Sequence, residues 1–209
     1  MWAIVKADKV ISVHAGIPSE IFTGDKRYDQ KHLSSLSEKE KQEIGLYPVT
    51  MGGEPDNKFH TISSVQYSFS NKKVTQSFSS KDKDLDDVNV VDADKKAVLD
   101  SDGVQVVQLG LKTISKQGTN KIAHSLINRF AWLVERKVFS DTAIPSAVTT
   151  YVAAVRTAAA KMVTEIDKVS SVSDLKVLYQ DTYNSKGEKT ATAVMSDWPS
   201  EKDVKTYLR

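Results

Sequence analysis

The sequence predicts an α+β protein, with antiparallel β-hairpins and one short helix in its N-terminal part and a C-terminal antiparallel helical hairpin. Before residue 114, short β-branched runs alternate with polar residues and are separated by turn residues, which is typical of hairpins. After residue 115, apolar residues recur three and four apart, which is typical of amphipathic helices. We therefore expect a mostly antiparallel β region over residues 1–114, and a helical hairpin with a C-terminal tail over residues 115–209.

The first hairpin is expected in Met1–Gly16. Its two alternating runs, MWAIVK and KVISVHAG, are separated by the polar pair Ala7–Asp8. Ile17–Tyr28 lacks a clear period, so we expect irregular structure there with a turn at Gly24–Asp25.

A short helix should follow Ser37. Glu40 lies three residues further on, which is the spacing of a capping box, and Gly45 can end the helix. Leu46–Met51 then reads as a strand, and Met51–Asn57 contains the glycine, proline and aspartate residues of a loop.

Thr61–Ser80 predicts a second antiparallel hairpin, with Asn71–Lys73 as its turn. Two alternating sets of side chains should form one partly aromatic face of this hairpin. They are Val65, Tyr67 and Phe69 on the first strand and Val74, Gln76 and Phe78 on the second.

The next segment, residues 81–102, is acidic, with seven aspartates between Asp82 and Asp100. Its few apolar residues should pack in part against a core; they are Val88, Val90, Val91, Val98 and Leu99. It ends in a turn at Asp100–Gly103. Val104–Ile114 is expected to be a strand, in which Gly110 suggests a bulge.

Two long helices are predicted next. Apolar residues at helical spacing place the first from residue 119 or 120 to Val138. Phe139–Ile144 should break it, and Pro145 suits the start of the second helix. Because only about six residues join them, the helices should be antiparallel neighbours. The second has an apolar seam of about three heptads, made by Val148, Val152, Val155, Ala159, Met162, Ile166 and Val169.

The end of the chain predicts smaller elements. Ser173 should cap a short helix that includes Leu175 and Tyr179. Asn184–Thr190 reads as a turn or loop, and the tail from Asp197 ends in a helical turn. We identify no internal repeat in the sequence.

The overall composition favours a globular protein and excludes several chemistries. Lysine and arginine (29) nearly balance aspartate and glutamate (27), and a net charge of +2 gives no field that would drive nucleic-acid or membrane binding. Without cysteine there is no disulfide, cysteine zinc site or thiol catalysis. No secretory signal and no run of 18 apolar residues is visible, so we expect synthesis in a reducing cytoplasm without membrane insertion.

The candidate metal ligands have unfavourable spacing. The four histidines, His14, His32, His60 and His124, are far apart, so we interpret them as surface or hairpin residues. The aspartates from Asp82 to Asp94 lack the glycine and glutamate positions of an EF-hand loop. They could form a looser calcium site or a solvated acidic loop, and we prefer the loop.

No catalytic or cofactor-binding motif is present. The glycines match neither a phosphate-binding loop nor a dinucleotide fingerprint, and no serine occupies a nucleophile elbow. We therefore predict no enzyme, no cofactor and no catalytic, cofactor-binding or metal-binding residue. The charged face around Arg129 and Arg136 is expected to be solvated, and the heptad seam is expected to pack within the chain and not between chains.

Three stretches of the sequence are distinctive in combination. The first is the Met-Trp-Ala opening, with the acidic helix and the Gly-Leu-Tyr strand that follow it, up to Val49. The second is Gly110–Ile127, which begins Gly-Leu-Lys. The third is Arg136–Lys137 with the Ile-Pro…Tyr-x-Ala-Ala-Val-Arg helix of Ile144–Arg156, closed by Ser196–Pro199. Together they resemble a family of small structural or accessory proteins encoded in the tail regions of tailed bacteriophages, common in phages of marine bacteria. Val152 stands where the family usually has arginine.

This resemblance implies a virion structural protein, associated with the tail or neck, that acts by packing against other virion proteins. We expect a homo-oligomer in the assembly and, from the net charge of +2 and the absence of a long apolar run, no nucleic-acid or membrane partner. The alternative is an assembly chaperone for tail fibres that is absent from the mature virion. A third hypothesis, a glycan hydrolase using the aspartates of residues 82–94, is disfavoured because carboxylates in a loop are poorly preorganised.

Overall fold

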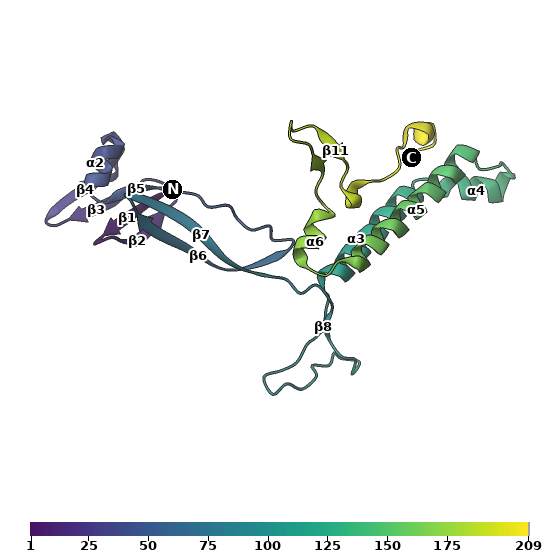
Figure 1. Ribbon diagram of the computed structural model, residues 1–209, viewed down its shortest axis with the longest axis horizontal. Helices are drawn as coiled ribbons and strands as arrows, with labels where there is room; N and C mark the ends of the chain where they lie inside the picture. Colours follow the sequence, from purple (N-terminus) through teal and green to yellow (C-terminus); the bar gives the residue numbers. More distant parts are fainter. Residues whose placement is uncertain (209) are drawn as a thin grey trace. The chain divides into compact units, whose positions relative to one another are not determined.

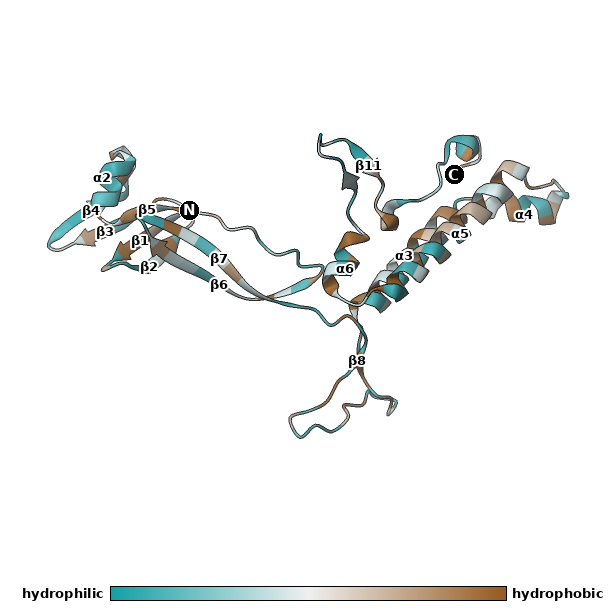
Figure 2. Cartoon of the chain, viewed as in Figure 1, coloured by the Kyte–Doolittle hydropathy of each residue, from teal (hydrophilic) through white to brown (hydrophobic). Residues whose placement is uncertain are grey.

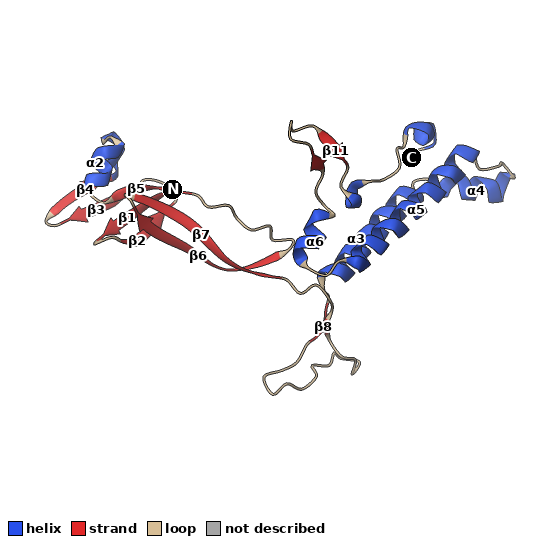
Figure 3. Ribbon diagram, viewed as in Figure 1, coloured by secondary structure: helices blue, strands red, loops and turns tan. Residues whose placement is uncertain are grey.

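The computed structural model describes residues 1–208 and confirms the α+β class (Figures 1 and 3). The chain divides into two compact units, Met1–Asp82 and Lys83–Arg209. The sequence placed the change of architecture at residue 114 instead. The difference arises because residues 84–87 are hydrogen-bonded to the beginning of the first long helix, which ties the acidic segment to the helical unit.

The first unit is built around a five-stranded sheet in the order β2-β1-β5-β7-β6. Its elements follow one another in the order β1 (Trp2–Lys6), β2 (Lys9–His14), β3 (Glu20–Thr23), β4 (Lys26–Asp29), α1 (Gln30–Ser35), α2 (Glu38–Glu43), β5 (Leu46–Thr50), β6 (His60–Ser70) and β7 (Lys73–Asp82).

Both predicted hairpins of this unit are confirmed. β1 pairs antiparallel with β2, and the turn between them has positive φ angles at Ala7 and Asp8, as two-residue hairpin turns require. β6 pairs antiparallel with β7 through a turn at Asn71 and Lys72, so Lys73 belongs to the strand and not to the turn.

The joint between these hairpins is an exception to the antiparallel prediction. β5 pairs with β7 in parallel, through Val49 opposite Val74 and Thr50 opposite Thr75. The intervening loop and β6 form the crossover that a parallel pair needs. The sheet is therefore mixed, with one parallel pair among antiparallel ones.

The sheet buries apolar side chains on both of its faces. Alternate residues of β1 point in opposite directions, so Ala3 joins a cluster with Val74 while Ile4 lies against a second cluster around Leu33 and Leu46. The second cluster is completed by the β3–β4 hairpin and α1. The prediction of irregular structure over residues 17–28 was therefore wrong, although its turn at Gly24–Asp25 is correct.

The short helix of this unit has the expected cap. The Ser37 hydroxyl accepts the amide of Glu40, and the Glu40 carboxylate accepts the amide of Ser37, which completes the capping box of α2. Helix α1, which the sequence analysis missed, is capped by the side chain of Asp29.

The second unit begins with an extended segment, residues 83–110, which we call the arm. Most of the rest of the unit is helical. Its elements are β8 (Val88–Asn89), β9 (Val107–Gln108), α3 (Leu111–Asn128), α4 (Ala131–Ser140), α5 (Ser146–Lys168), α6 (Val172–Val177), β10 (Thr182–Tyr183), β11 (Lys189–Ala191), and the 3₁₀ segments η1 (Val194–Ser196) and η2 (Lys202–Tyr207).

Helices α3 and α5 form the predicted antiparallel hairpin. Lys116 near the start of α3 pairs with Asp167 near the end of α5, while Phe130 just after α3 packs edge-on against Tyr151 near the start of α5. The α5 seam is buried at Val155 and Ile166, as its spacing predicted. At about 1.5 Å per residue, the 23 residues of α5 span roughly 35 Å.

The boundaries of the first long helix were predicted wrongly. It begins at Leu111, so only Val107–Gln108 of the predicted strand Val104–Ile114 is a strand, as β9, and Gly110 is the helix N-cap instead of a bulge. It also ends at Asn128, where Arg129 and Phe130 turn the chain and α4 begins as a separate helix. Phe130, at this turn, is buried against the α3–α5 core.

The end of the chain packs onto this helical core, and its small elements differ in detail from the prediction. The N-cap of α6 is Ser171, not Ser173. The turn predicted at residues 184–190 connects a small hairpin of β10 and β11. The Trp132 indole donates to the carbonyl of Tyr207 (3.1 Å), and Val204 is buried, which holds η2 against the helices. Among residues 1–208, no helix has the length and hydropathy required to cross a bilayer.

Candidate interaction site

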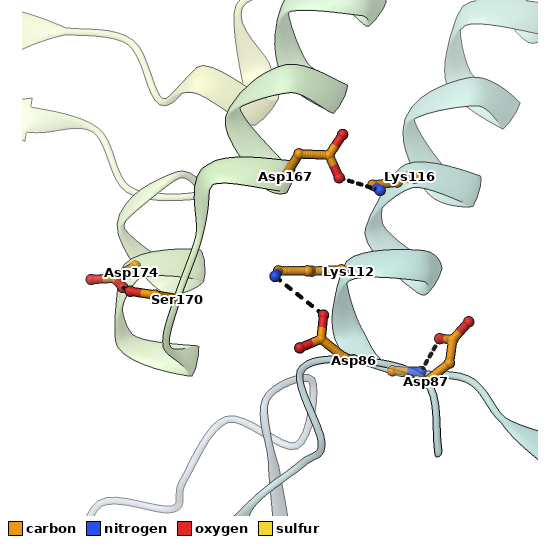
Figure 4. Close-up of polar contacts among 8 residues, drawn as sticks. Asp86, Asp87, Lys112, Lys116, Asp167, Ser170 and Asp174 are labelled. Atoms are coloured by element: carbon orange, nitrogen blue, oxygen red, sulfur yellow. Dashed lines mark hydrogen bonds and ion pairs between the residues drawn. The ribbon is translucent and has the colours of Figure 1, made fainter. Parts of the chain in front are cut away.

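The base of the arm is hydrogen-bonded to the beginning of α3 (Figure 4). The amide of Gly110 donates to the carboxylate of Asp87 (2.7 Å), and the amide of Leu111 donates to the carbonyl of Asp84 (2.9 Å). Helix starts have free amides, so these bonds satisfy donors that would otherwise face water. The Gly110 amide, followed by the Thr113 side chain, holds the pKa of the Asp87 carboxyl below its usual value.

Lys112 adds two further contacts to the base. Its amide donates to the carbonyl of Leu85 (3.0 Å), and its ammonium group pairs with Asp86 (3.1 Å; Figure 4). Gly110 leaves no room for a side chain here, because a β-carbon would lie 2.3 Å from the carbonyl carbon of Asp86. The two ends of the arm are thus packed against each other and against α3.

Beyond the base, the arm contains an eight-residue repeat that the sequence analysis missed. Val90–Ala97 and Val98–Gln105 both begin with two aliphatic residues followed by Asp-x-Asp. In both, the first aspartate accepts two backbone amides at 2.9 Å: Asp92 accepts those of Asp94 and Lys96, and Asp100 accepts those of Asp102 and Val104. The two copies of the repeat therefore form the same kind of turn.

The repeat closes into a small ring of backbone hydrogen bonds. The amide of Val90 donates to Val106, that of Val98 to Val90, and that of Val106 to Val98, at 2.8–3.0 Å. The side-chain amide of Gln105 lies within 2.8–3.2 Å of all three carbonyl oxygens of this ring. Cross-strand bonds of β8 and β9 connect the ring to the base.

The surface of the arm carries both exposed aliphatic side chains and aspartates. Contrary to the prediction that the aliphatic residues of the acidic segment would reach a core, Val88, Val91 and Leu99 are exposed. Val104, Val107 and Leu109 of the arm are exposed as well. Leu99 is 55% exposed and Val91 is 52% exposed, although both follow the ring directly. The arm also has three lysines and seven aspartates, a net charge of −4. Figure 2 shows apolar and polar residues interspersed along it.

A second surface feature of this unit is an apolar groove at the corner where α3, α4 and the first half of α5 meet. Its volume is about 390 Å³, and its lining is Ile127, Asn128, Phe130, Ala131, Val134, Ile144, Val148, Thr149, Val152, Ala153 and Arg156. Val134 is 54% exposed there. Arg156 is the one charged residue of the lining, and it has no hydrogen-bond or ion-pair partner among the residues that the structure describes.

The histidines singled out in the sequence are not brought together. His14 contacts the Ser12 hydroxyl (2.9 Å), and His60 pairs with Asp82 (2.8 Å) at the far end of the β6–β7 ribbon. His32 packs edge-on against Tyr28, and His124 is an exposed residue of α3.

The clustered aspartates have structural partners in several cases. Asp86 and Asp87 bind the start of α3, and Asp92 caps a turn of the repeat. Within residues 1–208, no group of three or more histidine, cysteine, aspartate or glutamate residues is placed to hold a metal ion.

The arm and the groove are therefore two features of the second unit that offer exposed apolar surface to another molecule. The repeat of aliphatic-aliphatic-Asp-x-Asp was the signal in the sequence that could have located the arm. The groove had no local signal, because it depends on the break between α3 and α4. Comparisons of the chain with protein-family models, with curated proteins and with solved structures give no match.

Proposed function

We propose that the protein is a structural component of a tailed-bacteriophage particle, associated with the tail or neck, that acts by packing against other virion proteins and against copies of itself. The resemblance of several stretches to phage tail-region proteins supports the choice of particle. In this proposal the chain is made in the cytoplasm of the host bacterium and becomes part of the virion.

The arm is the observation that carries the mode of action. Several aliphatic residues of the arm are exposed, and apolar surface that gathers on one segment of a folded protein is typical of a contact site for another macromolecule. Val91 and Leu99 are exposed on a segment whose base is fixed by hydrogen bonds to α3. A segment held in this way loses little conformational freedom on binding, which favours affinity. The arm is therefore suited to docking, and its short strand edges can pair with another chain.

Mass spectrometry of purified phage particles tests this proposal. We expect peptides of the chain in particles that have been washed with high salt, at a constant ratio to the other tail proteins. A phage that encodes Leu99→Asp should contain less of the protein per particle. A phage with Val177→Asp should not, because Val177 is an equally exposed aliphatic residue outside the arm.

A tail-fibre assembly chaperone would use the same kind of surface. It would be missing from finished particles and would bind unassembled fibre in a pull-down. That pair of results would replace the virion role with the chaperone role, and absence from both particle and fibre would contradict both.

A further inference from the structure

The groove at the α3–α4–α5 corner has the properties of a docking site for aliphatic side chains with a nearby acid. Its volume of about 390 Å³ lies within the range of about 300–1,000 Å³ that is usual for binding pockets. Its walls are mostly apolar, and the guanidinium of Arg156 gives it a single positive charge. An occupant should therefore combine exposed apolar residues with a carboxylate.

The arm offers this combination twice. Each repeat presents an exposed aliphatic residue, Val91 or Leu99, and three residues later an aspartate, Asp94 or Asp102. The side-chain carboxylates of these two aspartates have no hydrogen-bond or ion-pair partner in the described part of the chain. They are free to pair with an arginine of another molecule.

The charges of the two regions are also complementary. The arm has a net charge of −4, whereas residues 111–209 have fifteen lysines and arginines and ten aspartates and glutamates, a net charge of +5. Opposite net charges on two associating regions accelerate their encounter and favour the correct orientation.

The arm cannot reach the groove of its own chain. Its base is bonded to the first residues of α3, whereas Ile127 and Asn128 at the other end of α3 line the groove. The 18 residues of this helix separate the two by about 27 Å. The ring and the base hydrogen bonds hold the arm at the start of α3, where Figure 1 shows it leaving the helix pair.

We infer that the arm of one copy binds the α3–α4–α5 groove of a second copy, with Leu99 or Val91 in the apolar part and Asp102 or Asp94 facing Arg156. This inference deepens the proposed function, on which it rests, by naming the partner of the arm. Because two different surfaces meet, the contact is heterologous, and repeating it gives a closed ring or an open filament.

The test uses two full-length variants and analytical ultracentrifugation. Leu99→Asp removes the aliphatic group of the arm, and Ala153→Glu puts a charged side chain on an exposed position of the groove wall. We expect the wild-type protein to self-associate at about 100 µM, and each variant alone to do so at least about tenfold more weakly. Circular dichroism verifies that both variants keep the wild-type helix content.

Mixing the two variants gives the decisive result. The Ala153→Glu chain keeps an intact arm and the Leu99→Asp chain keeps an intact groove, so an equimolar mixture should form a one-to-one dimer that does not grow further. Val177→Asp serves as the matched control and should associate like the wild type. Raising the salt concentration should weaken the contact, since part of it is electrostatic.

Three results would overturn the inference. The first is a wild-type chain that stays monomeric at this concentration, and the second is variants that associate as well as the wild type. The third is a mixture of impaired variants that stays monomeric, which would mean that the arm does not bind the groove of a second copy. The ultracentrifugation result does not depend on whether mass spectrometry finds the protein in phage particles. Absence from virions would contradict the proposed function and leave a dimer of mixed variants standing.

Discussion

Gln105 is the side chain on which the ring of the arm depends. Its amide nitrogen has two hydrogens and lies near three carbonyl oxygens, those of Val90, Val98 and Val106. Each of these oxygens also accepts a backbone amide of the ring, so Gln105 reinforces bonds that already exist.

Replacing Gln105 with leucine, Gln105→Leu, should loosen the arm without unfolding the helices. One to two hydrogen bonds of about 1 kcal/mol would be lost, so exchange of the ring amides with solvent should accelerate by roughly tenfold. Hydrogen exchange followed by mass spectrometry measures this. Gln108→Leu is the matched control, because the exposed Gln108 is outside the ring. Equal exchange in both variants would mean that the backbone bonds hold the ring alone.

Asp87 predicts a dependence of stability on pH. Its pKa is lowered in the folded protein by the Gly110 amide and then by Thr113, so the folded state favours the ionised carboxylate. The resulting stabilisation is present above the ordinary aspartate pKa of about 3.9 and is lost as the pH falls through the lowered folded value.

Urea denaturation of the wild type and of Asp87→Asn at several pH values tests this sign. We expect the variant to be less stable at pH 7 and the two proteins to converge at acidic pH, where the carboxyl is protonated. A difference in stability that stays constant down to about pH 2 would show that the charge of Asp87 is not involved.

Among the elements, α5 was predictable and α3 was not, for a physical reason. The seam of α5 could be predicted from local sequence, because apolar residues three and four apart form one face of a helix in any context. The start of α3 depends on Asp87, 23 residues away from Gly110, whose carboxylate bonds to the N-cap amide. Locally, the valines before Gly110 favour a strand, and tertiary contacts override that preference.

The break after α3 and the ring of the arm show the same limit. Phe130 continues the helical spacing of α3, but the chain turns at this residue while its ring packs against Tyr151 in the core. The eight-residue repeat was visible in the sequence, whereas the closure of its strands through Val90, Val98 and Val106 depends on backbone geometry that no residue type specifies. The groove, which both α3 and α4 line, was unpredictable for that reason.

Val155 tests the packing of α5 against α3. It is 0% exposed, so Val155→Asp would bury an unpaired charge and should destabilise the second unit by roughly 3 kcal/mol or more. Thr157→Asp, on the exposed side of the same helix, should cost little. Thermal unfolding followed at 222 nm compares them. If Val155→Asp instead remained folded as a monomer, the seam would be a contact between chains.

In the described part of the chain, the apolar clusters on the two faces of the sheet lie within residues 1–82, and the cluster around Phe130 and Val155 lies within the second unit. Each unit buries its own apolar clusters, so each should fold when it is produced alone. We expect both fragments to unfold cooperatively, with β-type and helical circular dichroism respectively. A first fragment that aggregates, or a second that is molten, would show that the units depend on each other.

The net charge of the whole chain does not show how its charges are distributed. The total of +2 predicts no electrostatic partner, but it is the sum of an acidic arm, a basic helical region and a nearly neutral first unit. The arrangement became visible only when the arm was known to be a separate segment.

The single parallel pair of the sheet has a consequence for the order of folding. The β1–β2 and β6–β7 hairpins each need only neighbouring residues and can form within microseconds. The contact between β5 and β7 joins positions 25 apart in the chain and has two residue pairs, one of which contains the buried Val74. β5 also pairs with β1, through residues such as Trp2 and Pro48 that are even further apart in the chain. Joining the two hairpins through β5 should therefore be the slow step, and the first unit should assemble as two formed hairpins that meet late.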